Sequence, residues 1–88
     1  MEFEYDPNKS EANKKKHGID FEEAKALFCK DIDVYEAKQV DGERRFIIHG
    51  FIKEKCYSAI FTLRNGKIRI ISVRRCRDEE KRKAHKCS

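Results

Sequence analysis

The spacing of hydrophobic residues changes near residue 34, from a helical period to a period of two. Before this point, the apolar positions within residues 21–28 recur at the spacing that places them on one face of a helix. After it, apolar and polar residues alternate, which predicts four strands over 34–40, 45–52, 56–64 and 67–75. The pattern therefore predicts helices in the first part of the chain and a sheet in the second.

Capping and turn signals set the limits of these elements. The Asp-Pro pair at 6–7 favours a helix start, and Gly18 suits the left-handed residue that ends a helix. Residues 20–23, Asp-Phe-Glu-Glu, have the form of a capping box and begin a second helix. Asp-Gly at 41–42 and Asn-Gly at 65–66 fit type I′ turns, so we expect consecutive antiparallel strands.

A short strand at 3–5 precedes the two helices, and Asp78-Glu79-Glu80 opens a last helix. The predicted fold class is α+β: an antiparallel sheet of four main strands with two N-terminal helices and one C-terminal helix. We expect residues 1–88 to form a single domain.

The Asn-Gly turn at 65–66 also predicts a register. A two-residue loop, continued without irregularity, pairs Ala59 with Ser72 and Tyr57 with Arg74. Paired residues share a face of the sheet, so Arg74 is expected beside Tyr57, where an apolar core opens into a small polar site. A slip of one residue would invert this assignment.

Charge is high and unevenly spread. Charged residues make up 42% of the chain, against about 25% in an average domain. Residues 1–49 hold nine Lys or Arg and twelve Asp or Glu, whereas residues 50–88 hold twelve and four. A basic half on a small domain suggests a polyanionic partner such as nucleic acid, and the alternative is a solvated surface.

The absence of targeting signals in the sequence predicts the cellular compartment. No apolar run is long enough to cross a membrane, and the acidic N-terminus lacks the pattern of a secretion signal, so we expect a cytoplasmic protein. No cysteine spacing resembles a zinc site. In a reducing compartment the four cysteines are expected to be free thiols, with Cys87 able to cross-link.

Several polar residues could carry chemistry. Four arginines on the last hairpin could hold a phosphodiester backbone, or could instead cover sheet edges and pair with acids. His17 follows three lysines, which favours a neutral imidazole that can act as a base, although it could simply cap the helix. Glu43 could accept a proton or form a surface ion pair, and His49 is expected to be structural.

Three stretches of the sequence together resemble the BrnT family of ribonuclease toxins. The first is FEYDPNKSEANKKKHGIDFEEA, with its K-H-G and F-x-E-A motifs. The second is GERRFIIHG, which begins with G-E-x-R, and the third is FTLRNGKIRIISVRRC, which contains R-I-I-S-x-R. The resemblance spans residues 3–84, and the combination of K-H-G with R-I-I-S-x-R is its most specific part.

This resemblance implies the toxin of a bacterial type II toxin–antitoxin pair with a RelE-like fold. It implies a metal-independent endoribonuclease without a cofactor, which uses the 2′-hydroxyl of the RNA as nucleophile and thereby inhibits translation and growth. The implied partner is a BrnA-like antitoxin, which neutralises the toxin and through which alone operator DNA is bound. No membrane is implied.

The same resemblance, joined to the chemistry above, selects the candidate residues. The catalytic candidates are His17, Glu43, Arg64, Arg74 and Arg75. The RNA-binding candidates are Lys14, Lys16, Tyr57, Thr62, Arg69 and Arg77. The chain departs from the family where Tyr5 replaces a frequent Trp, and where His85 stands near the place of a C-terminal Tyr. The alternative function is a non-catalytic module that binds nucleic acid or docks a partner.

Overall fold

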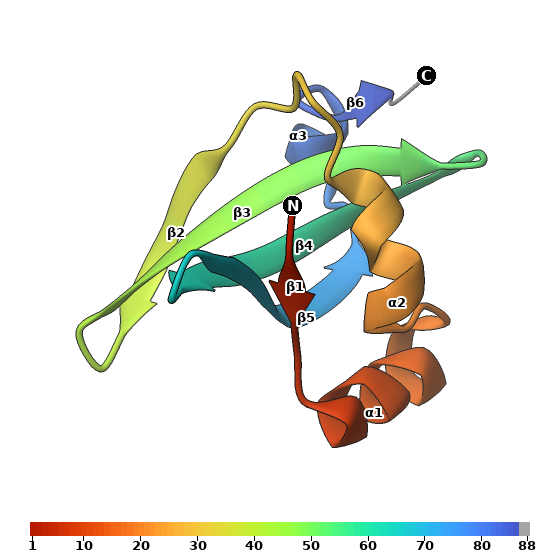
Figure 1. Ribbon diagram of the computed structural model, residues 1–88. Helices are drawn as coiled ribbons and strands as arrows, with labels where there is room; N and C mark the ends of the chain where they lie inside the picture. Colours follow the sequence, from red (N-terminus) through yellow and green to blue (C-terminus); the bar gives the residue numbers. More distant parts are fainter. Residues whose placement is uncertain (87–88) are drawn as a thin grey trace.

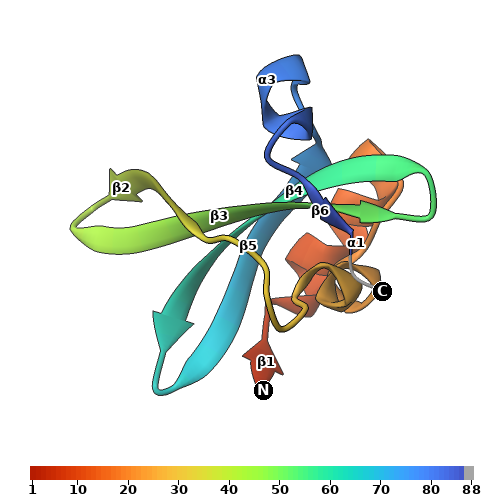
Figure 2. The ribbon, with the colours of Figure 1, turned by 90° about the horizontal axis from the view of Figure 1, so that it is seen from above.

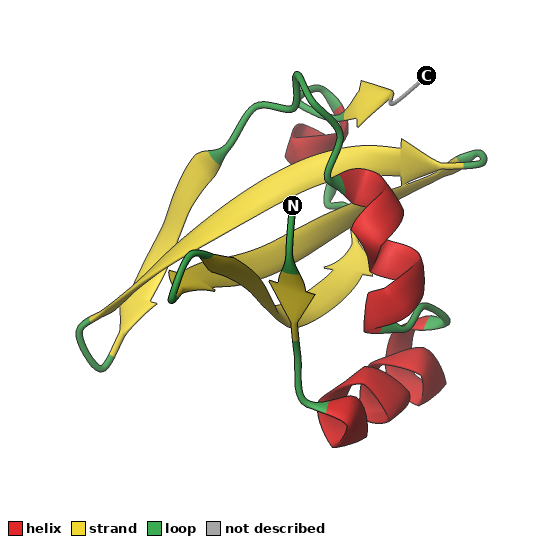
Figure 3. Ribbon diagram, viewed as in Figure 1, coloured by secondary structure: helices red, strands yellow, loops and turns green. Residues whose placement is uncertain are grey.

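One mixed sheet carries the fold in the computed structural model, which describes residues 1–86 (Figure 1; Figure 3). The elements along the chain are β1 (Phe3–Glu4), α1 (Pro7–His17), α2 (Phe21–Ala24), the 3₁₀ helix η1 (Lys25–Leu27), β2 (Tyr35–Val40), β3 (Glu43–Ile52), β4 (Lys55–Arg64), β5 (Lys67–Arg75), α3 (Asp78–Lys81) and β6 (His85–Lys86). The strands lie in the order β1-β5-β4-β3-β2, and β6 pairs with β3.

The four long strands and their antiparallel pairing confirm the sequence prediction. The sheet is not the simple antiparallel arrangement of four main strands that was predicted, because it has six strands: β1 pairs in parallel with β5 and β6 pairs in parallel with β3. The short strand predicted at 3–5 is present as β1, whereas β6 was not predicted and has only two residues, too few to show an alternating pattern. The last helix is a single turn, and His85 lies in β6 rather than in that helix.

Helices lie on both sides of the sheet. Figure 2 shows α3 on the opposite side from α1 and α2. We call the side of α2 and η1 the helix face, and the opposite side the open face. The core between the sheet and the N-terminal helices includes the fully buried side chains of Phe21, Leu27, Ile48, Ile70 and Val73. The open face is covered only in part, at the end where α3 lies.

Helix α1 is held by polar contacts. Its cap is the predicted one: the Asn8 N–H donates to Asp6 Oδ1 at 2.8 Å, and Gly18 ends the helix with a φ of 78°. Its buried side chains are Ser10 and Asn13, both polar. The helix therefore gains little from the hydrophobic effect, and its hydrogen bonds to the rest of the chain decide where it lies.

Asn13 makes the main connection between α1 and the sheet. Its Oδ1 accepts a hydrogen bond from the Val73 N–H of β5 at 3.2 Å, and its Nδ2 donates to the Ile19 carbonyl at 2.8 Å. One amide side chain thus satisfies two buried backbone groups on separate segments. This contact fixes α1 against the edge of β5, beyond the point where β1 ends.

A β-bulge in β5 changes the predicted register. Pairing from the Asn-Gly turn is as predicted up to Phe61 with Ile70, but the next pair is Ile60 with Ser72. Ile71 is the extra residue, and it reverses the faces of all residues that follow it in β5. Tyr57 therefore pairs with Arg75, and the prediction that Arg74 shares its face is wrong.

The bulge also explains a disulfide that the sequence analysis did not predict. Cys56 and Cys76 are bonded, with 5.3 Å between their Cα atoms. With Tyr57 opposite Arg75, the next pair outward is Cys56 and Cys76, whereas the unbulged register would not set them opposite each other. Cys29 is also disulfide-bonded, and Cys87 lies outside the described residues. The expectation of free thiols is wrong for these three residues.

We predict that Asn13→Ala lowers the free energy of unfolding by about 2 kcal/mol, because it leaves two buried backbone groups without partners. Urea unfolding followed by circular dichroism measures this change. Lys15→Ala is the matched control: Lys15 is exposed on the same helix, and its loss should change stability by less than about 0.5 kcal/mol. Equal stabilities of the two variants would show that the Asn13 bridge does not hold α1.

Candidate nucleic-acid interface

Four arginines from β3, β4 and β5 project from the open face. The register sets Arg69 opposite Thr62 and Arg74 opposite Ser58. The remaining two follow by alternation along their strands, and the full set is Arg45, Arg64, Arg69 and Arg74. These guanidinium groups form a basic surface on the sheet side that α1, α2 and η1 leave uncovered.

Each of these four arginines forms an ion pair with a glutamate. Glu43 lies 3.2 Å from Arg45 Nε and 3.9 Å from Arg64 Nη2. Glu4 Oε2 lies 3.8 Å from Arg69 Nη1. The pairing offsets part of the positive charge, but it also restricts the guanidinium groups to defined positions, which lowers the entropic cost of binding a ligand.

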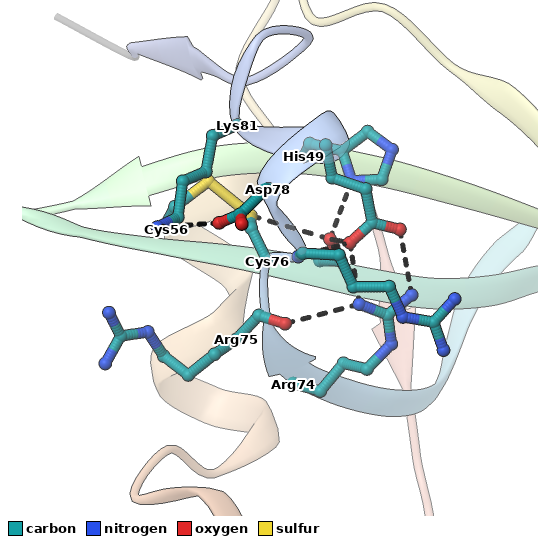
Figure 4. The surroundings of a disulfide bond; sticks show 10 residues. His49, Cys56, Arg74, Arg75, Cys76, Asp78 and Lys81 are labelled. Atoms are coloured by element: carbon teal, nitrogen blue, oxygen red, sulfur yellow. Dashed lines mark hydrogen bonds and ion pairs between the residues drawn. A yellow bond between two sulfur atoms is a disulfide. The ribbon is translucent and has the colours of Figure 1, made fainter.

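Arg74 has the most complete set of contacts. Its two Nη atoms donate to the two carboxylate oxygens of Glu80 at 2.7 and 2.9 Å. Glu80 Oε1 also accepts from the Arg77 N–H at 2.9 Å and from Ser58 Oγ at 3.0 Å. Figure 4 shows Arg74 in this cluster, next to the Cys56–Cys76 disulfide. Glu80 is thereby tied to β4, to β5 and to the start of α3.

The electrostatics of Glu80 follow from these contacts. The hydrogen bond from Arg74 is the largest cause that lowers the pKa of Glu80 from 4.5 to about 2, with the Arg77 N–H and Ser58 adding to it against the opposing effect of burial. Its carboxylate is therefore ionised at neutral pH. The Arg74–Glu80 pair is a salt bridge with side chains that are only 22% and 12% exposed.

His49 extends the cluster to β3. Its Nδ1 lies 2.6 Å from Ser58 Oγ, and both residues are buried. Because Ser58 donates its one proton to Glu80, its oxygen accepts from His49, which places a proton on Nδ1. Burial lowers the pKa of His49, so the imidazole is neutral at pH 7. This buried network orders the open face around Arg74.

Glu80 and Ser58 were not among the predicted site residues, and His49 was expected to be structural. A signal was present for two of them, since His49 and Ser58 are polar residues in the middle of otherwise apolar strands. No comparable signal marked Glu80, which lies among other charged residues. Its partner Arg74 became predictable only once the bulge was known.

His17 and Lys16 lie at the edge of β5. His17, Lys16, Lys9 and Ser72 are among the residues that line a cavity of about 210 Å³ between α1 and β5. Ser72 pairs with Ile60 next to the Arg74–Ser58 pair, so the cavity adjoins the open face. The structure therefore brings a histidine and two lysines to the border of the arginine surface.

Other predicted residues lie elsewhere. Arg75 stands on the helix face with its guanidinium 5.7 Å from the centre of the Tyr57 ring. Tyr57 is buried and lines a cavity of about 530 Å³. Lys14 pairs with Glu23, which lines that same cavity, at 2.7 Å. The side chains of these three candidates therefore lie on the opposite face of the sheet from the side chain of Arg74.

The last two RNA-binding candidates, Thr62 and Arg77, differ in their exposure. Thr62 is buried on the open face and donates its hydroxyl to the Arg44 carbonyl at 2.7 Å. Arg77 is exposed at the N-terminus of α3. The predicted residues therefore fall into an open-face set, an edge set and a helix-face set. Two direct contacts join catalytic candidates: Glu43 lies near Arg64, and Arg74 Nη1 donates to the Arg75 carbonyl at 3.2 Å.

Two absences concern the part of the chain that the structure describes. Among residues 1–86, no group of three or more His, Cys, Asp or Glu side chains is placed to hold a metal ion. No helix within the same residues is long and apolar enough to cross a membrane.

Comparison with known proteins gives one match. The model of the family described as "Ribonuclease toxin, BrnT, of type II toxin-antitoxin system" matches residues 5–80. The match covers the helices of the N-terminal half, all four long strands and Glu80. No curated protein and no solved structure is similar enough to the chain to count as a match.

We predict that Glu80→Gln lowers the free energy of unfolding at pH 7 by about 3 kcal/mol, because it leaves Arg74 without its counter-charge. The pKa of Glu80 is lower in the folded state, so its contribution is full above pH 4.5 and is lost as the pH falls towards about 2. The difference between the wild type and Glu80→Gln should therefore shrink across that window in urea unfolding. The control is Glu79→Gln at an exposed neighbour, and a difference that stays constant would contradict a lowered pKa.

Proposed function

The chain belongs to the BrnT family of ribonuclease toxins of type II toxin–antitoxin systems, and on that premise we propose that it is a metal-independent endoribonuclease acting on the open face of its sheet. Cleavage of cellular RNA would inhibit translation and growth in the cytoplasm. A BrnA-like antitoxin would neutralise the toxin, and operator DNA would be bound only through that antitoxin. No cofactor takes part in the proposed reaction.

The observation that carries the proposal is the arginine surface bordered by His17. RNA presents a phosphate at every nucleotide, and guanidinium groups bind phosphate oxygens with two hydrogen bonds at once. Arg69 and Arg74 lie on the same face of one hairpin with the Ile60–Ser72 pair between them, and Lys16 and His17 lie at its edge. On the helix face, α2 and η1 pack over part of the sheet, where Phe21 and Leu27 are buried.

The proposed chemistry is attack by the 2′-hydroxyl of the RNA on the adjacent phosphorus. His17 takes the proton of that hydroxyl as general base, and Glu43 is the alternative base. The bond to the 5′-oxygen breaks and that oxygen takes a proton from water, which leaves a 2′,3′-cyclic phosphate on one product and a 5′-hydroxyl on the other. Arg74 and Arg64 offset the negative charge that builds up on the phosphorane oxygens.

The geometry favours His17 over Glu43 as the base. Glu43 already accepts a hydrogen bond from Arg45 and lies near Arg64, so its carboxylate oxygens are engaged by two arginines. His17 lines a cavity with Lys9 and Lys16 that adjoins the arginine surface, which places its imidazole where a bound strand would pass. Arg74 is held rigidly by Glu80, which suits a group that stabilises charge at a fixed position.

We predict that the purified chain cleaves total RNA in the presence of EDTA, and that His17→Ala lowers the rate by about 100-fold or more through loss of the base. Arg74→Lys should also lower the rate, since lysine keeps the charge but not the two-pronged geometry. Lys15→Ala, an exposed change on the same helix as His17, should leave the rate unchanged. Gel analysis of the RNA, with product ends identified by mass spectrometry, measures all three.

Absence of cleavage by a folded wild type would overturn the enzymatic proposal. The remaining candidate would then be a non-catalytic module that binds nucleic acid, which the Glu-paired arginines also suit, because pairing reduces the charge available to a transition state. RNA binding that weakens steeply with salt would identify that module. Unchanged cleavage by His17→Ala would transfer the role of base to Glu43, for which Glu43→Gln is the test.

A further inference from the structure

The helices cover only part of the helix face. Figure 1 shows α2 over one end of the long strands, and no helix among residues 1–86 lies over the other end. On that uncovered part, a groove of about 310 Å³ follows η1. Its floor is formed by Phe46, Phe61, Leu63 and Ile68, and residues 28–34 supply a wall.

The groove leaves large apolar side chains in water. Leu63 in its floor is 60% exposed, and Val34 in its wall is 53% exposed. In a soluble protein, contiguous exposed apolar residues of this kind mark a surface that binds another macromolecule. Phe28 and Phe61, which pack edge to face at 5.1 Å, give this surface a firm base.

The shape of the groove indicates a helix as its occupant. Its floor continues the same sheet face on which Leu27 of η1 and Phe21 of α2 are buried. A second helix beside η1 would complete the helical layer, as in two-layer α+β folds. An added strand would instead need a sheet edge, and the groove lies over the face rather than at an edge.

The charge of the groove indicates the chemistry of that helix. Among the described residues, Lys30 has the only charged side chain that lines the groove, and no ion pair involves it. A partner helix with an apolar face flanked by an acidic residue would bury Leu63 and Val34 and neutralise Lys30. The net charge of +5 on the chain also favours an acidic partner.

We infer that this groove is the docking site for the antitoxin, which inserts an amphipathic helix with an acidic flank. The inference rests on the proposed function, because a toxin of a type II pair is held by a protein partner. It adds the position of the contact: the groove and the arginine surface lie on opposite faces of the sheet. The antitoxin would therefore anchor on one face while the rest of it restricts the other.

The test is calorimetric titration of the purified chain with its purified cognate antitoxin protein. Leu63→Gln is expected to weaken binding by about tenfold or more, and Leu63→Gln combined with Val34→Gln by more. Val40→Gln is the matched control, because Val40 is 40% exposed but does not line the groove, and it should leave the affinity unchanged. Lys30→Glu should weaken binding through charge repulsion. Unfolding midpoints confirm that each variant is folded.

Each other outcome overturns the inference in a distinguishable way. Unchanged affinity of the groove variants, with a loss of binding on Arg69→Ala, would place the antitoxin on the arginine surface. A wild-type dimer that Leu63→Gln dissociates would make a second copy of the chain the occupant. Absence of binding by the wild type would exclude the antitoxin altogether. Because titration needs no ribonuclease activity, a failure of the enzymatic proposal would leave this result unaffected.

Discussion

One extra residue in β5 determines how the chemistry of this protein is divided between the two faces of its sheet. Ile71 has no partner in the ladder with β4, so each residue that follows it faces the side opposite to the one that the Asn-Gly turn would give it. Arg74 reaches Glu80 on the open face, Arg75 reaches Tyr57 on the helix face, and Cys76 reaches Cys56. A regular strand would exchange the faces of these three residues.

The local elements of the fold were predictable because their signals are local. The Asp6 cap, the capping box at Asp20 and the two Gly-containing turns each depend on a few adjacent residues, and all are present. The bulge, the parallel pairing of β1 and the strand β6 depend on tertiary contacts, and no periodicity in the sequence indicates them. The prediction of the candidate site was incomplete for the same reason, since the partner of Arg74 is a glutamate on a different element.

The two faces carry surfaces of opposite character. Paired arginines around Arg74 make the open face polar and ordered, whereas the groove beside Leu63 is apolar and exposed. In a small domain with a thin core, packing between the helices and the sheet buries most of the apolar residues, so few exposed apolar surfaces remain. That an apolar surface remains beside η1 suggests that the free chain is only one component of its functional form.

The polar attachment of α1 has a further consequence for dynamics. Local opening of a protein costs least where few apolar contacts must be broken, and α1 buries only Ser10 and Asn13. Among the elements that border the open face, α1 can therefore detach and return with the least disturbance of the core. His17 is at the end of this helix, so the fold holds its charged surface rigid while its candidate base has room to adjust to a bound strand.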